Sequence, residues 1–174
     1  NGVTPCEVQV KEATGDYYSG DGGTVLETVT ADRVLIATGA KPRDLPFAPC
    51  DGNTIINSAH AMTLESRPES LVIIGSGAIG MEFAYVYNVF GTKVTVIEML
   101  DRILPVEDEE VSKLAQRAFK KQGITFHTNT GVKNIDLSGD GGTVTYSPIG
   151  EDSKEETITG EKILIAIGVA PRCD

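Results

Sequence analysis

The stretch 71–98, LVIIGSGAIGMEFAYVYNVFGTKVTVIE, constrains the fold of this chain more than any other. It begins with an apolar run at 71–74, which is typical of a short strand buried on both faces. A glycine-rich turn follows, and then a helix-like segment at 78–90 that Gly91 should end. A second apolar strand at 93–97 ends on Glu98. The order predicts a βαβ unit with an acid at the end of its second strand.

The glycine turn, residues 75–80, fits the pattern G-x-G-x-x-G. Gly75 permits a tight turn, Gly77 lets a pyrophosphate approach the backbone, and Gly80 lets the helix pack closely on the strand. The helix N-terminus then offers N–H groups and a partial positive charge to the phosphates. Glu98 follows Gly80 by 18 residues, where a carboxylate can accept hydrogen bonds from an adenosine ribose. This context favours a dinucleotide site over a packing motif without a ligand.

Glu98 also predicts the kind of dinucleotide. Repulsion between this carboxylate and a 2′-phosphate about 4 Å away would weaken binding by on the order of 1–4 kcal/mol, depending on the effective dielectric constant. No arginine stands at or directly after Glu98, and the nearest one, Arg102, comes four residues later. The sequence therefore favours NAD over NADP.

The charge of the chain limits its partners. The net charge of −10 over 174 residues argues against nucleic acid and against an anionic membrane surface. No apolar run approaches the roughly 20 residues of a membrane span. We therefore expect a small-molecule ligand, no nucleic acid and no membrane.

The cysteines and histidines give no sign of a disulfide framework or a metal centre. Cys6, Cys50 and Cys173 are odd in number, and no two of them have a C-x-x-C spacing. Such thiols are typical of a reducing compartment, so we expect the cytoplasm, or the mitochondrial matrix in a eukaryote. His60 and His127 show no metal-ligand spacing, and no metal site is expected.

The rest of the chain alternates strands and helices. The predicted elements are a hairpin of 7–12 and 24–30 with a turn at 19–23, a buried strand at 34–37, a linker at 44–70 with a short helix near 58–65, a helix at 107–122, a strand at 124–126, a three-stranded meander of 132–137, 143–147 and 155–159, and a buried strand at 162–166. The predicted fold class is α/β, with a Rossmann-like βαβαβ parallel sheet and a three-stranded antiparallel meander.

An internal repeat suggests that a second nucleotide-binding unit exists. Residues 31–43, ADRVLIATGAKPR, align without gaps on residues 160–172, GEKILIAIGVAPR, and SGDGGTV occurs upstream of each copy. The second copy follows the G-x-G-x-x-G unit, whereas nothing of that kind precedes the first. We therefore expect the chain to be an internal piece of a larger protein with two dinucleotide-binding domains.

Two such domains, the first ending with the segment ATGA and the second ending with the segment AIGVAPR, resemble the pyridine nucleotide-disulfide oxidoreductase family. Within that family, residues 70–111 are most similar to its dihydrolipoamide dehydrogenase branch. The resemblance implies that residues 1–48 are the β-rich tail of an FAD-binding domain, that 49–168 form an NAD-binding domain, and that 169–174 return toward the FAD domain.

The resemblance also implies roles for individual residues. Gly75, Ser76, Gly77, Ala78, Ile79 and Gly80 would hold the NAD pyrophosphate, Glu98 the adenosine ribose, and Met99 and Val132 the adenine. Glu82 would lie toward the nicotinamide, Gly168 near its ribose, and Thr38 and Gly39 would touch FAD in the intact enzyme. For Glu82, the alternative of a helix-face residue with a structural partner stays open.

For the intact enzyme the resemblance implies a homodimer that uses FAD to oxidise a dihydrolipoyl group, on a lipoyl domain or another disulfide substrate, and reduces NAD. The family's flavin-binding glycine motif, its cysteine pair and its acid/base pair are absent from these 174 residues. We expect this chain to bind NAD(H) and to contain no catalytic residue. The alternatives are a piece of a related flavoprotein, such as an NADH oxidase, a transhydrogenase or a mercuric reductase, and a free-standing NAD-binding module.

Overall fold

The computed structural model describes residues 5–12, 23–150 and 154–172, in two units, Asn1–Gly39 and Ala40–Asp174. The first unit contains strands β1 (Cys6–Lys11) and β2 (Val25–Ala31), which pair antiparallel and confirm the predicted hairpin. Except for Gly23, the turn predicted at 19–23 lies outside the described residues. The predicted division into three domains at 48/49 and 168/169 stays a prediction.

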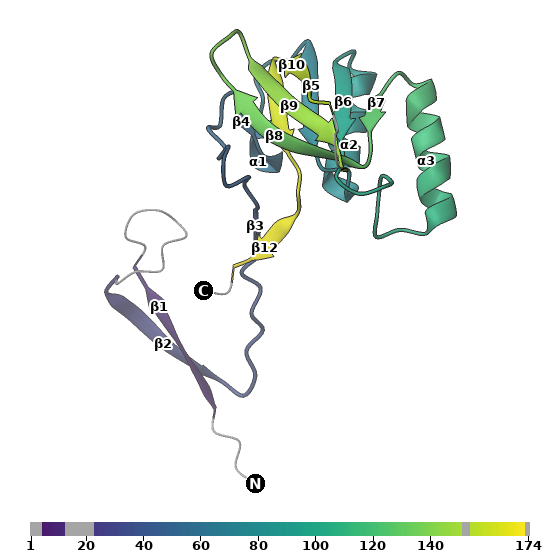
Figure 1. Ribbon diagram of the computed structural model, residues 1–174. Coiled ribbons are helices and arrows are strands. Elements are labelled where there is room, and N and C mark those ends of the chain that lie inside the picture. Colours follow the sequence, from purple (N-terminus) through teal and green to yellow (C-terminus); the bar gives the residue numbers. More distant parts are fainter. Residues whose placement is uncertain (1–4, 13–22, 151–153, 173–174) are drawn as a thin grey trace. The chain divides into compact units, whose positions relative to one another are not determined.

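The second unit is built on a five-stranded parallel sheet (Figure 1). The strands, in spatial order, are β4 (Ile55–Ile56), β11 (Lys162–Ile165), β5 (Ser70–Ile74), β6 (Lys93–Ile97) and β7 (Thr125–His127). This order confirms the predicted Rossmann-like sheet. Strand β4 was not predicted, because two residues inside a polar linker carry too little pattern to indicate a strand.

Three helices connect the strands. Helix α1 (Ser58–Ala61) is shorter than the helix predicted at 58–65 and begins at Asn57, whose side chain caps it. Helix α2 (Ala78–Val89) follows the glycine turn as predicted. Helix α3 (Glu109–Lys121) begins two residues later than predicted, because the Asp108 side chain caps it by accepting from the Glu110 N–H at 2.8 Å. None of these helices, in the part of the chain that the structure describes, has the length and apolar composition of a membrane span.

The apolar periodicity of α3 places Val111, Leu114, Ala115, Ala118 and Phe119 on one face, but the structure buries only part of that face. Ala115 and Phe119 pack against the core, whereas Val111 and Leu114 are 51% and 64% exposed. The buried residue of this helix is instead Ser112, whose hydroxyl donates to the Leu104 carbonyl oxygen at 3.1 Å. Because that hydrogen bond satisfies the hydroxyl, a polar residue can take the inward position that apolar periodicity would give to a neighbour.

Strands β8 (Thr130–Asp136), β9 (Gly142–Pro148) and β10 (Glu156–Gly160) form the predicted antiparallel meander, which makes a third layer. Alternate residues of β5, the central strand of the parallel sheet, pack on opposite faces of that sheet. Leu71 and Ile73 pack in one buried cluster with residues of α2, and Val72 and Ile74 pack in the other with residues of β9. A strand that is apolar on both faces therefore separates a helical layer from the meander.

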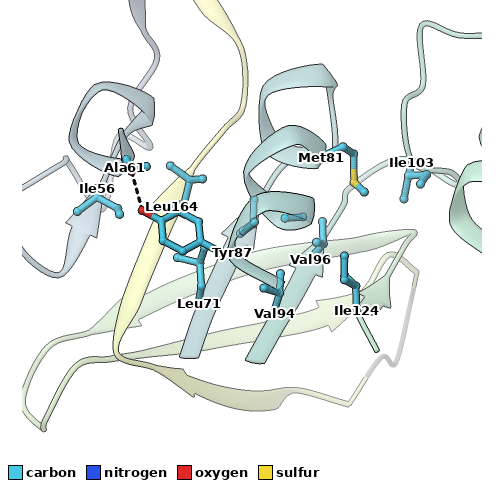
Figure 2. Close-up of a cluster of buried hydrophobic side chains, with 12 residues drawn as sticks. Ile56, Ala61, Leu71, Met81, Tyr87, Val94, Val96, Ile103, Ile124 and Leu164 are labelled. Carbon is cyan, nitrogen blue, oxygen red and sulfur yellow. Dashed lines mark hydrogen bonds between the residues drawn. The ribbon is translucent and has the colours of Figure 1, made fainter. Parts of the chain in front are cut away.

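Tyr87 joins α2 to α1 inside the first cluster (Figure 2). Tyr87 is 8% exposed, and its hydroxyl donates to the Ala61 carbonyl oxygen at 2.6 Å. Burial raises the pKa of the Tyr87 hydroxyl, which keeps it in the neutral form that can donate. This hydrogen bond satisfies a carbonyl at the end of the short helix α1.

The prediction of a buried strand at 34–37 is wrong for this structure. Residues 33–39 are in no helix or strand, and Leu35 and Ile36 are 90% and 75% exposed. The matching residues of the second repeat form β11, which pairs with β4 on one side and β5 on the other. The same kind of sequence becomes a strand only where it has neighbours to pair with, and none of the described residues pairs with 34–37.

The two repeat copies meet in a short antiparallel ribbon of β3 (Ala40–Pro42) and β12 (Val169–Pro171). Lys41 lies opposite Ala170, which is its own counterpart in the repeat. The Arg43 N–H donates to the Gly168 carbonyl oxygen at 3.0 Å, and the Arg43 Nε donates to the Val169 carbonyl oxygen at 3.1 Å. The ribbon therefore pairs corresponding segments of the two repeat copies, which are related by a local two-fold axis.

We predict that Tyr87→Phe lowers the free energy of unfolding by about 1–2 kcal/mol, because it leaves the Ala61 carbonyl without its buried donor. Urea unfolding followed by circular dichroism measures this change. Tyr85→Phe is the matched control, since Tyr85 is 47% exposed and keeps its ring contact with Phe119. Equal stability of the two variants would contradict a structural role for the Tyr87 hydroxyl.

Candidate functional site

A cavity of about 650 Å³ opens at the carboxyl ends of β5, β6 and β11. In the sheet, the chain proceeds from β5 to β6 and β7 on one side, whereas β11 and β4 lie on the other side. Ligands of open α/β sheets bind at such a switch point. The cavity is lined by Leu45, Ile74, Gly75, Ser76, Gly77, Ala78, Ile79, Ile97, Glu98, Met99, Leu100, Pro105, Val106, Thr130, Gly131, Val132, Ala166, Ile167 and Gly168.

Two glycines of the turn are required by packing. Gly75 has φ +99°, and a Cβ there would lie 2.4 Å from the Ala166 carbonyl oxygen. A Cβ on Gly80 would lie 2.2 Å from the Gly75 carbonyl oxygen. A Cβ on Gly77, in contrast, would have nothing within 4 Å, and this glycine faces the cavity. The turn is thus closed on the protein side and open on the cavity side.

The N-terminus of α2 provides the polar groups of this turn. Gly77 is the N-cap residue and no side chain caps the helix. The first N–H groups of an α-helix have no partner within the helix, and the helix dipole adds a partial positive charge. No lysine or arginine lines the cavity within the described residues. An anion in this cavity would therefore depend on the backbone N–H groups of α2.

Glu98 is the one charged residue among the described residues that line the cavity, and it is 7% exposed. Its Oε2 accepts from both the N–H and the hydroxyl of Ser76, each at 2.7 Å. Its Oε1 accepts from the Leu100 N–H at 2.8 Å. A carboxylate has about four acceptor positions, so one position, on Oε1, is left for a ligand.

The connection 99–107 closes the outer edge of the cavity with apolar side chains. It is attached to the glycine turn where the Leu104 N–H donates to the Ser76 carbonyl oxygen at 2.9 Å. Leu104 has φ +48°, which is unusual for a residue with a side chain, and its carbonyl accepts from the Glu107 N–H and the Ser112 hydroxyl. Arg102 donates to the Pro105 carbonyl oxygen at 3.2 Å and does not line the cavity.

The structure brings most of the predicted site residues together. The cavity is lined by Gly75, Ser76, Gly77, Ala78, Ile79, Glu98, Met99, Val132 and Gly168. Gly80 lies behind the turn, in a packing position. Glu82 is exposed on α2, outside the cavity lining, and its carboxylate makes no ion pair or hydrogen bond with the described residues. Thr38 and Gly39 belong to the other unit, Asn1–Gly39, and are described apart from this cavity.

Sequence reasoning missed the rest of the lining, most of which is apolar. The missed residues are Leu45, Ile74, Ile97, Leu100, Pro105, Val106, Thr130, Gly131, Ala166 and Ile167. The apolar residues after Glu98 could have indicated a cavity wall, since an acid that ends a strand is followed directly by the loop above the strand ends. Leu45 carries no such signal, because it reaches the cavity from a polar linker.

The described cysteines lie outside the cavity. Cys6 is exposed on β1, and Cys173 lies outside the described residues. The Cys50 thiol donates to the Ile55 carbonyl oxygen at 3.0 Å and lies 3.4 Å from Nδ1 of His60. Burial raises the pKa of the Cys50 thiol, which favours the neutral thiol over the reactive thiolate.

The curated proteins that this chain resembles include several named dihydrolipoyl dehydrogenase. The chain is 36% identical over 174 residues to dihydrolipoyl dehydrogenase of Bacillus subtilis and 41% identical over 154 residues to dihydrolipoyl dehydrogenase of Mycobacterium tuberculosis. These matches cover 97% and 88% of this chain but 37% and 32% of those proteins. The chain thus spans about a third of the length of the curated relatives it matches.

Solved structures agree with this result. The chain resembles LpdA of Mycobacterium tuberculosis with a TM-score of 0.71 and 32% identity, covering 86% of this chain and 32% of LpdA. It resembles the HOCl-induced flavoprotein disulfide reductase RclA of Escherichia coli with a TM-score of 0.68 and 27% identity, covering 83% of this chain and 32% of RclA. The family model described as pyridine nucleotide-disulphide oxidoreductase matches residues 5–174. The chain belongs to the pyridine nucleotide-disulphide oxidoreductase family, as the sequence resemblance predicted.

Proposed function

We propose that the cavity binds NAD(H) and that the chain is the nicotinamide-nucleotide part of a flavin-dependent disulfide oxidoreductase of the dihydrolipoyl dehydrogenase type. One observation carries this proposal. A buried carboxylate, Glu98, stands beside an uncapped helix N-terminus in one cavity, and hydrogen bonds to Ser76 hold the two together. This arrangement offers an acceptor for ribose hydroxyls next to donors for a pyrophosphate.

The other lining residues suit the rest of the ligand. Met99 and Val132 offer apolar contact for an adenine ring at the end of the cavity that Glu98 occupies. Gly168 follows β11, on the other side of β5, where the nicotinamide ribose would lie. The N–H groups at the start of α2 lie between these two ends and would bind the pyrophosphate. Bound NAD(H) supplies the hydride chemistry, and this chain's residues bind and orient it.

The lining favours NAD over NADP. A 2′-phosphate near Glu98 would meet a negative charge that the surroundings hold in place, and no basic residue among the described lining residues could compensate for it. Arg102, the nearest arginine in sequence, donates to a backbone carbonyl and pairs with Asp101 at 3.5 Å. The electrostatic cost of NADP is then on the order of 1–4 kcal/mol.

For the intact protein we propose FAD as the second cofactor, with Thr38 and Gly39 in contact with it and Glu82 directed toward the nicotinamide. In this proposal residues 1–48 end the FAD domain, 49–168 form the NAD domain, and 169–174 return toward the FAD domain. The substrate is a dihydrolipoyl group, on a lipoyl domain or another disulfide-forming partner, and the enzyme is a cytoplasmic homodimer. The similarity to the flavoprotein disulfide reductase RclA keeps a related flavoprotein with another substrate as the second candidate.

We predict that calorimetric titration of this chain detects binding of NADH and little binding of NADPH. Glu98→Ala should weaken NADH binding by roughly tenfold or more, because it removes a charged acceptor of the ribose hydroxyls. Absence of binding with both nucleotides would contradict the proposed function of the cavity. A preference for NADPH would contradict the role assigned to Glu98.

We predict that Gly77→Ala leaves the fold intact but weakens NADH binding by roughly tenfold, because a methyl group there separates a pyrophosphate from the helix N–H groups. Gly139→Ala is the matched control, since a Cβ at either glycine has nothing within 4 Å and Gly139 lies outside the cavity. Thermal unfolding checks the fold, and the same titration measures affinity. Unchanged affinity of Gly77→Ala would show that the pyrophosphate does not approach the turn at this residue.

A further inference from the structure

Among the groups around the cavity, the Ser76 hydroxyl has a partner that the glycine pattern does not explain. The pattern G-x-G-x-x-G assigns no role to the side chain at this position. Here the Ser76 side chain is fully buried, and its hydroxyl donates to Glu98 Oε2 at 2.7 Å. A hydroxyl that is directed at a carboxylate within the protein is not directed at a phosphate of a ligand.

The hydroxyl changes what Glu98 can offer. Oε2 already accepts from the Ser76 N–H, so the hydroxyl fills its second acceptor position. Oε1 accepts from the Leu100 N–H and retains one position. The carboxylate is thus fixed from both sides, with a single acceptor position available to the cavity. Two of its three donors are backbone groups, and the Ser76 hydroxyl is the one donor that a substitution can remove.

We propose that Ser76 is a positioning residue that sets the discrimination between dinucleotides with a 2′-hydroxyl and those with a 2′-phosphate, by holding the Glu98 carboxylate in place. This inference rests on the proposed function. A carboxylate with three charge-assisted hydrogen bonds cannot swing away from an approaching phosphate without losing one of them. Without the hydroxyl, the carboxylate keeps only two backbone donors and turns more easily away from a 2′-phosphate, so the repulsion falls.

The test compares ADP-ribose with 2′-phospho-ADP-ribose by calorimetry, since these probes contain the adenosine end of the ligand and need no flavin. We expect Ser76→Ala to change the Kd of ADP-ribose by less than about threefold, because one hydrogen bond within the protein is lost while the acceptor for the ribose remains. We expect the ratio of the two Kd values to fall roughly tenfold, since the fixed charge is released.

A double-mutant cycle separates positioning from packing. If Ser76 acts through Glu98, then Ser76→Ala added to Glu98→Gln leaves the ratio of Kd values where Glu98→Gln alone puts it. Thr92→Val is the matched control, because the buried Thr92 hydroxyl also donates one hydrogen bond, to the Pro68 carbonyl oxygen at 2.8 Å, and lies outside the cavity. It should leave the ratio unchanged. Ser76→Cys, with a weaker donor, carries the same test if Ser76→Ala does not fold.

The outcomes are distinct. Two results would each overturn the role of Ser76: an unchanged ratio of the two Kd values in Ser76→Ala, or a further change of that ratio when Ser76→Ala is added to Glu98→Gln. ADP-ribose binding by the unmodified chain with an unchanged ratio in Ser76→Ala would overturn this inference alone. Failure of the unmodified chain to bind ADP-ribose at all would overturn the proposed function together with it.

Discussion

The close approach of the glycine turn to the ends of β5 and β11 is the constraint on which the nucleotide-sized cavity depends. Side chains at Gly75 and Gly80 would collide with the Ala166 and Gly75 carbonyl oxygens, so the turn can adopt this position only without them. Because the turn lies so deep, α2 begins at the carboxyl edge of the sheet, and its N-terminal N–H groups face the space above the strands. The anion binding that we propose for this site would therefore be a consequence of packing.

A hydrogen-bond network fixes the position of the acid relative to the turn. Glu98 is joined to the turn through Ser76, the turn is joined to the connection 99–107 through Leu104, and Leu104 is joined to α3 through Ser112. Leu104 has a strained left-handed backbone that these contacts stabilise. A charge held in this way is preorganised, so the ribose binding that we propose would not require the carboxylate to be ordered first.

The sequence predicted the parts of the fold whose pattern is local. The strand, glycine turn, helix and acid of residues 71–98 have the predicted order, and β6 has the predicted bounds. Features that depend on distant partners were not predictable in this way. The residues 34–37 have the pattern of a strand but no partner among the described residues, and β4 is a strand only because Ile55 and Ile56 pair with β11. The buried position of Ser112 depends on a carbonyl made available by the unusual backbone of Leu104.

The candidate site likewise has a part that local sequence predicted and a part that it did not. Glycines and an acid have a spacing that predicts phosphate and ribose contacts, whereas the apolar wall at Leu100, Pro105 and Val106 depends on how a loop folds over the strands.

The decisive experiment for the role of this cavity is a titration of the ¹⁵N-labelled chain with NAD⁺, in which amide chemical shifts are measured. We predict that the changes concentrate at 75–79, 98–100, 130–132 and 166–168. Changes concentrated elsewhere, or no changes at saturating NAD⁺, would contradict the claim that this cavity is the nucleotide site.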